Sequence, residues 1–273
     1  MDEKKQRIFT RISNKQTVKL YDDADISPMP TQQIIEYNAS YDNTGLVLPK
    51  PSKTSNITNK GKNNKAVYVT ADGTKHVLKK IPKGRILFNG NNNYVEIHEP
   101  FDDTQLDIRV THNVKIKIMG SKRKRNITIL KLSSPDKPNN KNNVVIGKNL
   151  SCPYGMKINL ARGNGDVIIG DNCMFSTDLL IRTGDGHSIF DTETGKLINP
   201  NKSIFIGNNV WCGVYVRIFK GAKILDNSIV GACSVVTKEF NETNIIVAGN
   251  PAQIVRRNIK WDRNPPIVFE DDE

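Results

Sequence analysis

Apolar residues return at every sixth position through the second half of the chain. They form three blocks, which contain Ile146, Cys152 and Ile158, then Ile169, Phe175 and Ile181, then Ile206, Cys212, Ile218, Ile224, Val230 and Val236. The first residue of each block is followed by glycine, and Val230 repeats this pair. An internal repeat decides the architecture before any single strand is assigned.

A six-residue period predicts a short strand followed by a tight corner. One side chain per repeat points inward, and glycine or asparagine at the corner tolerates the positive φ that most residues avoid. Three repeats make a triangular coil that cannot bury its apolar side alone, so coils stack and hydrogen-bond to one another. We predict an all-β fold with a parallel β-helix over residues 141–248. A right-handed β-helix and a non-catalytic solenoid share the period, but neither explains its interruptions.

The remaining segments are less regular. Residues 81–140 alternate short β-type runs with asparagine-rich corners, which predicts irregular β coils leading into the solenoid. Residues 1–80 show no sustained period and are interrupted by prolines, so their structure stays open. Residues 249–273 form a short C-terminal extension.

Composition narrows the cellular context. The chain has 273 residues, 37% of them hydrophobic, which is enough for a substantial core. Its start lacks the apolar run of a signal peptide, and no stretch approaches the roughly 18 apolar residues that cross a bilayer. We therefore expect a cytoplasmic protein without an integral membrane segment. The four cysteines are widely separated, so we predict buried thiols rather than a metal site or disulfides.

The net charge of +12 favours an anionic partner without naming it. The densest basic run, residues 121–125, lies between two β-type runs. We predict a solvated turn there rather than a nucleic-acid patch, and expect no nucleic acid partner.

The repeat breaks at residues 161–166 and, at greater length, at residues 183–203. Insertions expelled from a regular solenoid are where function tends to lie. Four motifs accompany the breaks, and they are Gly184-Asp185-Gly186-His187, Asn209-Val210-Trp211-Cys212-Gly213, Gly231-Ala232-Cys233-Ser234 and Ala248-Gly249-Asn250-Pro251-Ala252. Together they resemble the hexapeptide-repeat acetyltransferases, especially the bacterial capsule and O-antigen sugar O-acetyltransferases. The resemblance covers roughly residues 141–261 and implies a left-handed β-helix.

His187 is the candidate catalytic residue. Transfer of an acyl group to a neutral sugar hydroxyl needs a base, and an imidazole can hold that proton near neutral pH. His187 is the only histidine in the repeat half, and the resemblance implies this role for it. Asp185, Asp191 or a backbone carbonyl could orient its ring. Cysteine nucleophiles are the competing idea, but Cys152 and Cys212 occupy inward positions and should be inert.

We expect three candidate residues to line a cofactor groove. Trp211 precedes an inward position, so strand alternation directs it outward. The resemblance implies that it lies between subunits near coenzyme A and the next chain's histidine; a packing role between subunits is the alternative. Gly213 and Ala232 offer the close backbone approach that a pantetheine arm needs, and they match family positions.

Three further residues could bind the phosphates of coenzyme A. Thr237, Lys238 and Arg256 supply hydrogen bonds and charge, although a solvated face would have the same composition. Gln253 stands where related sequences often carry a basic residue, which puts the grip on the ribose phosphate in doubt.

These observations lead us to expect a homotrimeric O-acetyltransferase that uses acetyl-CoA and acts on a sugar hydroxyl of a surface polysaccharide or its precursor. N-acetylation of a nucleotide-linked amino sugar is the alternative reaction. A non-catalytic glycan-binding or scaffolding solenoid is the alternative of another class. We expect no metal, because a metal-dependent β-helix needs three convergent histidines and His98 and His112 lie outside the clear repeats.

Overall fold

The computed structural model describes residues 56–131 and 140–264. Strands in these residues form three sheets, and no helix occurs among them. Sheet A has the order β1 (Asn56–Asn59), β4 (Lys83–Phe88), β6 (Thr104–Val110), β8 (Arg125–Lys131), β10 (Cys152–Asn159), β13 (Leu179–Arg182), β16 (Arg217–Phe219) and β19 (Val235–Val236). Sheet B has the order β17 (Lys223–Ile224), β14 (Ile204–Ile206), β11 (Val167–Ile169), β9 (Asn142–Ile146), β7 (Val114–Ile118), β5 (Tyr94–His98), β2 (Lys65–Val69) and β3 (Lys75–Val77). Sheet C has the order β12 (Met174–Phe175), β15 (Trp211–Cys212), β18 (Ile229–Val230), β20 (Ile246–Gly249) and β21 (Ala252–Arg256).

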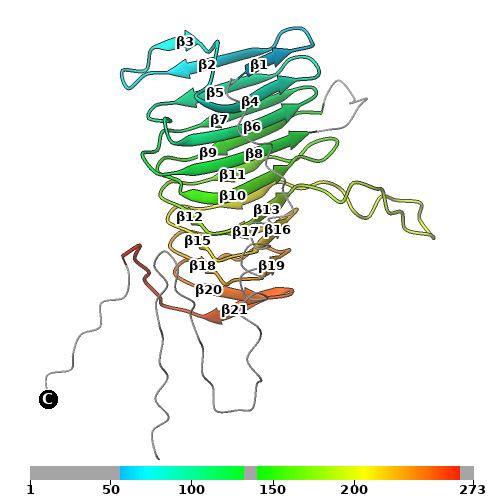
Figure 1. The fold of residues 1–273 in the computed structure, drawn as a ribbon. Coiled ribbons are helices and arrows are strands. Elements are labelled where there is room, and N and C mark those ends of the chain that lie inside the picture. Colours follow the sequence, from blue (N-terminus) through cyan, green and yellow to red (C-terminus); the bar gives the residue numbers. More distant parts are fainter. Residues whose placement is uncertain (1–55, 132–139, 265–273) are drawn as a thin grey trace, which may run out of the picture. The chain divides into compact units, whose positions relative to one another are not determined.

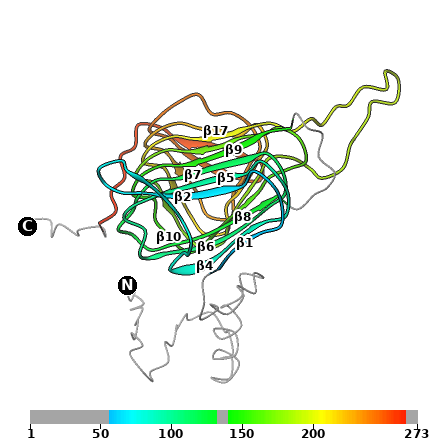
Figure 2. The ribbon, with the colours of Figure 1, turned by 90° about the horizontal axis from the view of Figure 1, so that it is seen from above.

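The chain visits the three sheets in turn and so winds into a β-helix. From β10 it passes to β11 in sheet B, then to β12 in sheet C, and returns to sheet A at β13. Neighbouring strands are parallel except for two hairpin pairs, β2 with β3 and β20 with β21. Figure 1 shows the coils stacked one on another, and Figure 2 looks along the stack. The predicted all-β parallel β-helix is confirmed.

The predicted inward positions form the core. All twelve repeat residues are buried, with at most 1% of their surface exposed. They stack in register, so that in sheet B Ile146 lies against Ile169, which lies against Ile206. Each coil therefore covers the apolar side of its neighbour, and burial of one such side chain stabilises the fold by roughly 1.5–3 kcal/mol.

The same columns of stacked apolar side chains continue through the coils that precede residue 141. Ile86, Ile108, Ile129 and Ile158 are register partners along sheet A, and all four are buried. The coils before β12 contribute strands to sheets A and B but none to sheet C. Their third side is irregular, which removes the six-residue period although the stacking persists. Residues 1–55 lie outside the described part of the chain.

Asparagines turn one corner of successive coils. Asn149, Asn172, Asn209, Asn227 and Asn244 all have positive φ values, between 51° and 59°. Their side chains join coils, since Asn149 Nδ2 donates to Asn172 Oδ1 at 3.1 Å and Asn209 Nδ2 donates to Asn227 Oδ1 at 3.0 Å. Asparagine suits this left-handed conformation because its short polar side chain can hydrogen-bond locally.

Two sequence predictions about burial were wrong. Cys152, Cys173 and Cys212 are buried as predicted, but Cys233 is exposed because it occupies a corner with φ 57°. The basic run 121–125 is not wholly solvated, because Arg125 is only 1% exposed.

Arg125 starts β8 and turns its guanidinium into the coil. Its Nε donates to Thr104 Oγ1 at 3.0 Å, and its Nη1 donates to the Met119 carbonyl at 2.7 Å. Burial lowers the pKa of this guanidinium to about 10. The other three basic residues of the run are exposed, as the predicted turn requires.

Candidate active site

Residues 183–203 leave the β-helix between β13 and β14 as a projecting arm, drawn at the right of Figure 1. The arm is a short antiparallel hairpin in which Phe190 pairs with Leu197. Two backbone hydrogen bonds of 2.9 Å reinforce it, from Asp191 N to Lys196 O and from Ile198 N to Ile189 O. The arm therefore has a defined structure although it lies outside the coils.

A polar cluster at the base ties the arm to the β-helix. Asp185 Oδ2 accepts from Lys220 Nζ at 2.5 Å and from Asn199 Nδ2 at 2.9 Å. Lys220 Nζ also donates to the Asn199 carbonyl at 3.1 Å. The hydrogen bond from Lys220, followed by that from Asn199, lowers the pKa of the Asp185 carboxyl. The ion pair thus connects both ends of the arm to the coil below.

His187 lies just beyond this cluster with its side chain exposed. Its carbonyl accepts from Asn199 Nδ2 at 2.9 Å, so its backbone is tethered while its imidazole faces solvent. Asp185 is engaged by Lys220, and Asp191 accepts from the backbone N–H groups of Glu193 and Thr194. Within residues 56–131 and 140–264, neither carboxylate hydrogen-bonds the imidazole.

Trp211 lies on the outer face of β15, as strand alternation predicts. Its register partners on the same face are Met174 of β12 and Ile229 of β18. The indole of Trp261 lies beside it, with ring centroids 5.9 Å apart and ring planes tilted by 45°. Trp211 is therefore half-buried rather than fully exposed.

Gly213 and Ala232 touch through their backbones. A Cβ atom built on Gly213 would lie 2.7 Å from the Ala232 nitrogen and 2.9 Å from its Cα atom. Two coils therefore pack so closely at position 213 that only glycine fits there. Gly213 directly follows β15, the strand that carries Trp211.

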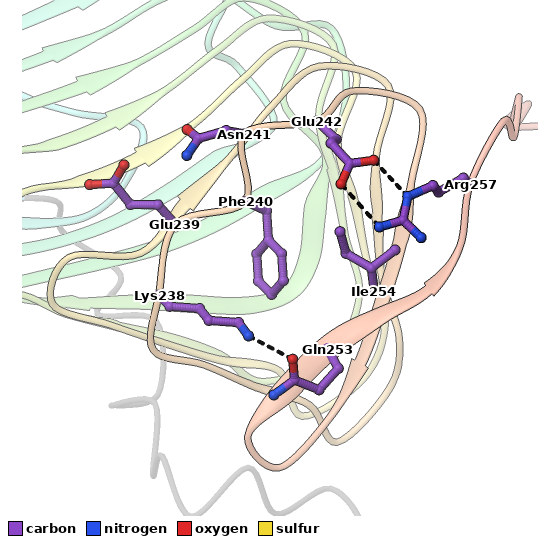
Figure 3. A pocket seen from close by; sticks show the side chains of 8 residues that line it. All are labelled: Lys238, Glu239, Phe240, Asn241, Glu242, Gln253, Ile254 and Arg257. Carbon is purple, nitrogen blue, oxygen red and sulfur yellow. Dashed lines mark hydrogen bonds and ion pairs between the residues drawn. The ribbon is translucent and has the colours of Figure 1, made fainter.

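The charged candidates lie near the C-terminal end of the β-helix. Figure 3 shows a shallow pocket between the turn after β19 and β21, and Lys238 is the only predicted cofactor residue that lines it. Lys238 Nζ donates to Gln253 Oε1 at 2.6 Å and lies 5.4 Å from the Phe240 ring centroid. Thr237 is exposed beside Lys238, and exposed Arg256 pairs in register with Ile246 at the edge of sheet C.

Within one chain, the two strongest candidate residues, His187 and Trp211, lie on different sides of the β-helix. The arm leaves where sheet A passes into sheet B, whereas Trp211 belongs to sheet C, which forms the third side of the coils from β12 onward. Figure 1 shows the arm and the strands of sheet C on opposite sides of the stack. His187 and Trp211 of the same chain therefore do not face a common cleft.

Comparison with known proteins assigns the family. No protein-family model matches the chain. A polysialic acid O-acetyltransferase of Escherichia coli O1:K1 / APEC is 35% identical over 130 residues, which cover 48% of this chain and 41% of that protein. A protein of Staphylococcus aureus (strain COL), named as an inferred acetyltransferase, is 31% identical over 144 residues, covering 48% of this chain and 69% of that protein. The chain belongs to the hexapeptide-repeat acetyltransferases. Its described residues form the parallel β-helix that the resemblance implied.

The extent of the similarity is limited. The chain spans about half the length of the sugar O-acetyltransferases that it matches. The match to the solved structure of the polySia specific acetyltransferase NeuO covers 80% of this chain and 93% of the NeuO chain, with 28% sequence identity and a TM-score of 0.49. No helix in the part of this hexapeptide-repeat protein that the structure describes is long and apolar enough to span a membrane.

Sequence reasoning missed three residues around the site. Lys220 and Asn199 brace the arm, and Trp261 packs on Trp211. Nothing in the sequence singled out Lys220, because a lysine at the end of a strand is ordinarily solvated. Trp261 had one weak signal, since it is one of only two tryptophans and follows the last repeat.

Proposed function

We propose that this protein transfers the acetyl group of acetyl-CoA to a sugar hydroxyl of a surface polysaccharide or its precursor. The observation that carries the proposal is the solvent-facing imidazole of His187 on a braced arm, in a chain of the acetyltransferase family. The other histidines, which are His76, His98 and His112, lie on coils before residue 141.

In the proposed reaction His187 acts as general base. Its neutral imidazole takes the proton of the acceptor hydroxyl while the oxygen attacks the acetyl carbonyl carbon. Backbone N–H groups can stabilise the resulting tetrahedral oxyanion. The C–S bond then breaks, and the imidazolium returns its proton to the thiolate of coenzyme A.

Direct transfer is favoured over an acyl-cysteine intermediate. Burial raises the pKa of the Cys152 thiol to about 12 and that of Cys212 well above its usual range. Neither sulfur is therefore a thiolate at neutral pH, and both are covered by the core. Cys233 is exposed on the corner between β18 and β19, and the proposed direct transfer does not use it.

The cofactor groove that we propose combines small and cationic residues. Trp211, Gly213 and Ala232 would bind the pantetheine arm. Gly213 and Ala232 pack closely through their backbones and carry no long side chain that would block it, and Gly213 directly follows the strand of Trp211. Thr237, Lys238 and Arg256 would bind the phosphates. All three are exposed, and Lys238 would exchange the neutral Gln253 amide for an anion.

We further propose a homotrimer as the catalytic form. Because the arm and Trp211 lie on opposite sides of one chain, a site containing both needs a second copy. The arm carries four exposed apolar side chains suited to such a contact, which are Ile189, Phe190, Leu197 and Ile198. The arm of one copy would then meet sheet C of the next.

An acidic acceptor polysaccharide suits this chain. Its net charge is +12, and two of the relatives are named as polysialic acid O-acetyltransferases. A cationic surface attracts such a polymer before binding. We place the reaction in the cytoplasm, because it consumes acetyl-CoA.

Binding and turnover test the proposal together. Calorimetry of the purified full chain with acetyl-CoA should give saturable binding, and chromatography should detect free coenzyme A when a polysialic acid acceptor is added. Chromatography is preferable to a thiol reagent because Cys233 is exposed. Absence of acetyl-CoA binding would favour a non-catalytic solenoid, and acetylation of amino sugars alone would favour the N-acetyl reaction.

A further inference from the structure

The segment 257–264, which we call the strap, runs back along the asparagine corner beside sheet C. Ile259 N donates to the Asn244 carbonyl at 3.0 Å, and Trp261 Nε1 donates to the Asn209 carbonyl at 2.8 Å. Further along, Arg263 Nη2 donates to the Asn172 carbonyl at 2.7 Å. These acceptors belong to successively earlier coils, so the strap fastens several coils together. Figure 1 shows the strap as the red segment that follows β21.

Trp261 is the anchored residue of the strap. Only 9% of its surface is exposed, and its indole N–H is satisfied by Asn209. The Arg263 guanidinium lies 5.8 Å from the Trp261 ring centroid and is itself held by the carbonyls of Asn172 and Cys173. Ring stacking and cation–π attraction thus hold one orientation of this indole.

Trp211 has no such anchor of its own. Among the residues that the structure describes, its indole N–H has no hydrogen-bond partner. Its register partners on the outer face of sheet C are Met174 and Ile229, and its ring lies beside that of Trp261. Of these neighbours, within the described part of the chain, only Trp261 has a side chain that is held by a hydrogen bond.

We propose that Trp261 is a positioning residue that holds the Trp211 indole in the orientation that binds acetyl-CoA. This inference rests on the proposed function for the identity of the ligand. Trp261 acts through Trp211 and does not contact the reacting atoms. The strap thereby links the C-terminal extension to the cofactor groove on sheet C.

The two tryptophans of the chain make the test direct. In Trp261→Phe and Trp261→Ala, all indole fluorescence comes from Trp211. The phenyl ring keeps the stacking contact, whereas alanine removes it. We expect acrylamide to quench Trp211 at least about twofold more strongly in Trp261→Ala than in Trp261→Phe.

Acetyl-CoA binding provides the second readout. An aromatic pair contributes about 0.5–1.5 kcal/mol, which corresponds to roughly 2- to 12-fold in a dissociation constant. Calorimetry should show the Kd for acetyl-CoA raised within that range by Trp261→Ala and largely restored by Trp261→Phe. Val255→Ala is the matched control, because Val255 is 61% exposed and lies on β21, which β18 and β20 separate from the strand of Trp211 in sheet C.

The outcomes separate the two proposals. Equal quenching of Trp211 in Trp261→Ala and Trp261→Phe, together with a Kd in Trp261→Ala equal to that of the native protein, would overturn the positioning role. If the native protein does not bind acetyl-CoA, the proposed function fails, while the quenching comparison still decides whether Trp261 holds Trp211. Should circular dichroism show Trp261→Ala unfolded, Trp261→Leu fills more of the space and carries the same comparison.

Discussion

The ammonium group of Lys220 lies 2.5 Å from the carboxylate of Asp185, and this ion pair joins the arm that carries His187 to the coil below it. Lys220 also reaches the carbonyl of Asn199 at the other end of the arm. A single side chain of the β-helix therefore holds both ends of the arm, which limits where His187 can be.

Removal of this ammonium group should loosen the arm. In Lys220→Met the Asp185 carboxylate loses its strongest partner, so we expect turnover to fall about 10-fold, because misplacement of a catalytic group is costly. Trypsin should also cleave faster after Lys196 in the arm, as followed by mass spectrometry. Lys148→Met is the control, since Lys148 is exposed on a corner and its ammonium group joins no ion pair within the described residues.

Replacement of His187 tests the proposed base. His187→Ala should fold and bind acetyl-CoA like the native protein, because the side chain is exposed and the Asn199 tether uses the backbone carbonyl. Turnover should fall at least about 100-fold, the usual contribution of a general base. Ser188→Ala on the same arm should keep its activity. Near-native turnover of His187→Ala would reject the assignment.

The asparagine corner should contribute stability through backbone conformation as well as hydrogen bonding. Asn227 has φ 58° and accepts from Asn209 Nδ2. In Asn227→Ala the left-handed conformation costs roughly 1–2 kcal/mol and the hydrogen bond is lost as well. Asn227→Gly loses only the hydrogen bond, so it should be more stable than Asn227→Ala in urea unfolding. Equal stability of the two variants would show that backbone strain is not the cause.

A buried carboxylate in the N-terminal coils predicts acid sensitivity. Burial opposes ionisation of Glu96, but hydrogen bonds from Lys75, His98 and Tyr94 outweigh it and lower its pKa from 4.5 to about 2. Lys117 adds an ion pair at 3.6 Å. The lowered pKa means that this stabilisation is complete above about pH 4.5 and is lost as the pH falls through about 2.

Glu96→Gln should isolate that contribution. At pH 7 its thermal unfolding midpoint should lie below that of the native protein, and the difference should shrink between pH 4.5 and 2. Glu193→Gln, which changes an exposed carboxylate on the arm, should follow the native protein throughout. A difference for Glu96→Gln that does not depend on pH would contradict the argument.

The sequence by itself determined the architecture of residues 141–248, because the same strand and corner recur in every repeat and identical coils stack on one another. Ile146, Cys152 and their successors are inward in every coil, since a period of six places one apolar side chain on each side of the triangle. The outward direction of Trp211 and the projection of residues 183–203 followed from the same phase. The family resemblance then singled out His187 within that projection.

Only the tertiary structure decided which distant residues meet. Trp261 is fifty residues beyond Trp211 in the chain, and nothing local indicates that the strap turns back onto sheet C. Likewise the burial of Arg125 depends on Thr104 of the preceding coil, and the grip on the arm depends on Lys220 of the following one. Such contacts join separate coils, and a periodic pattern records the inward direction of a side chain but not its neighbours across the stack.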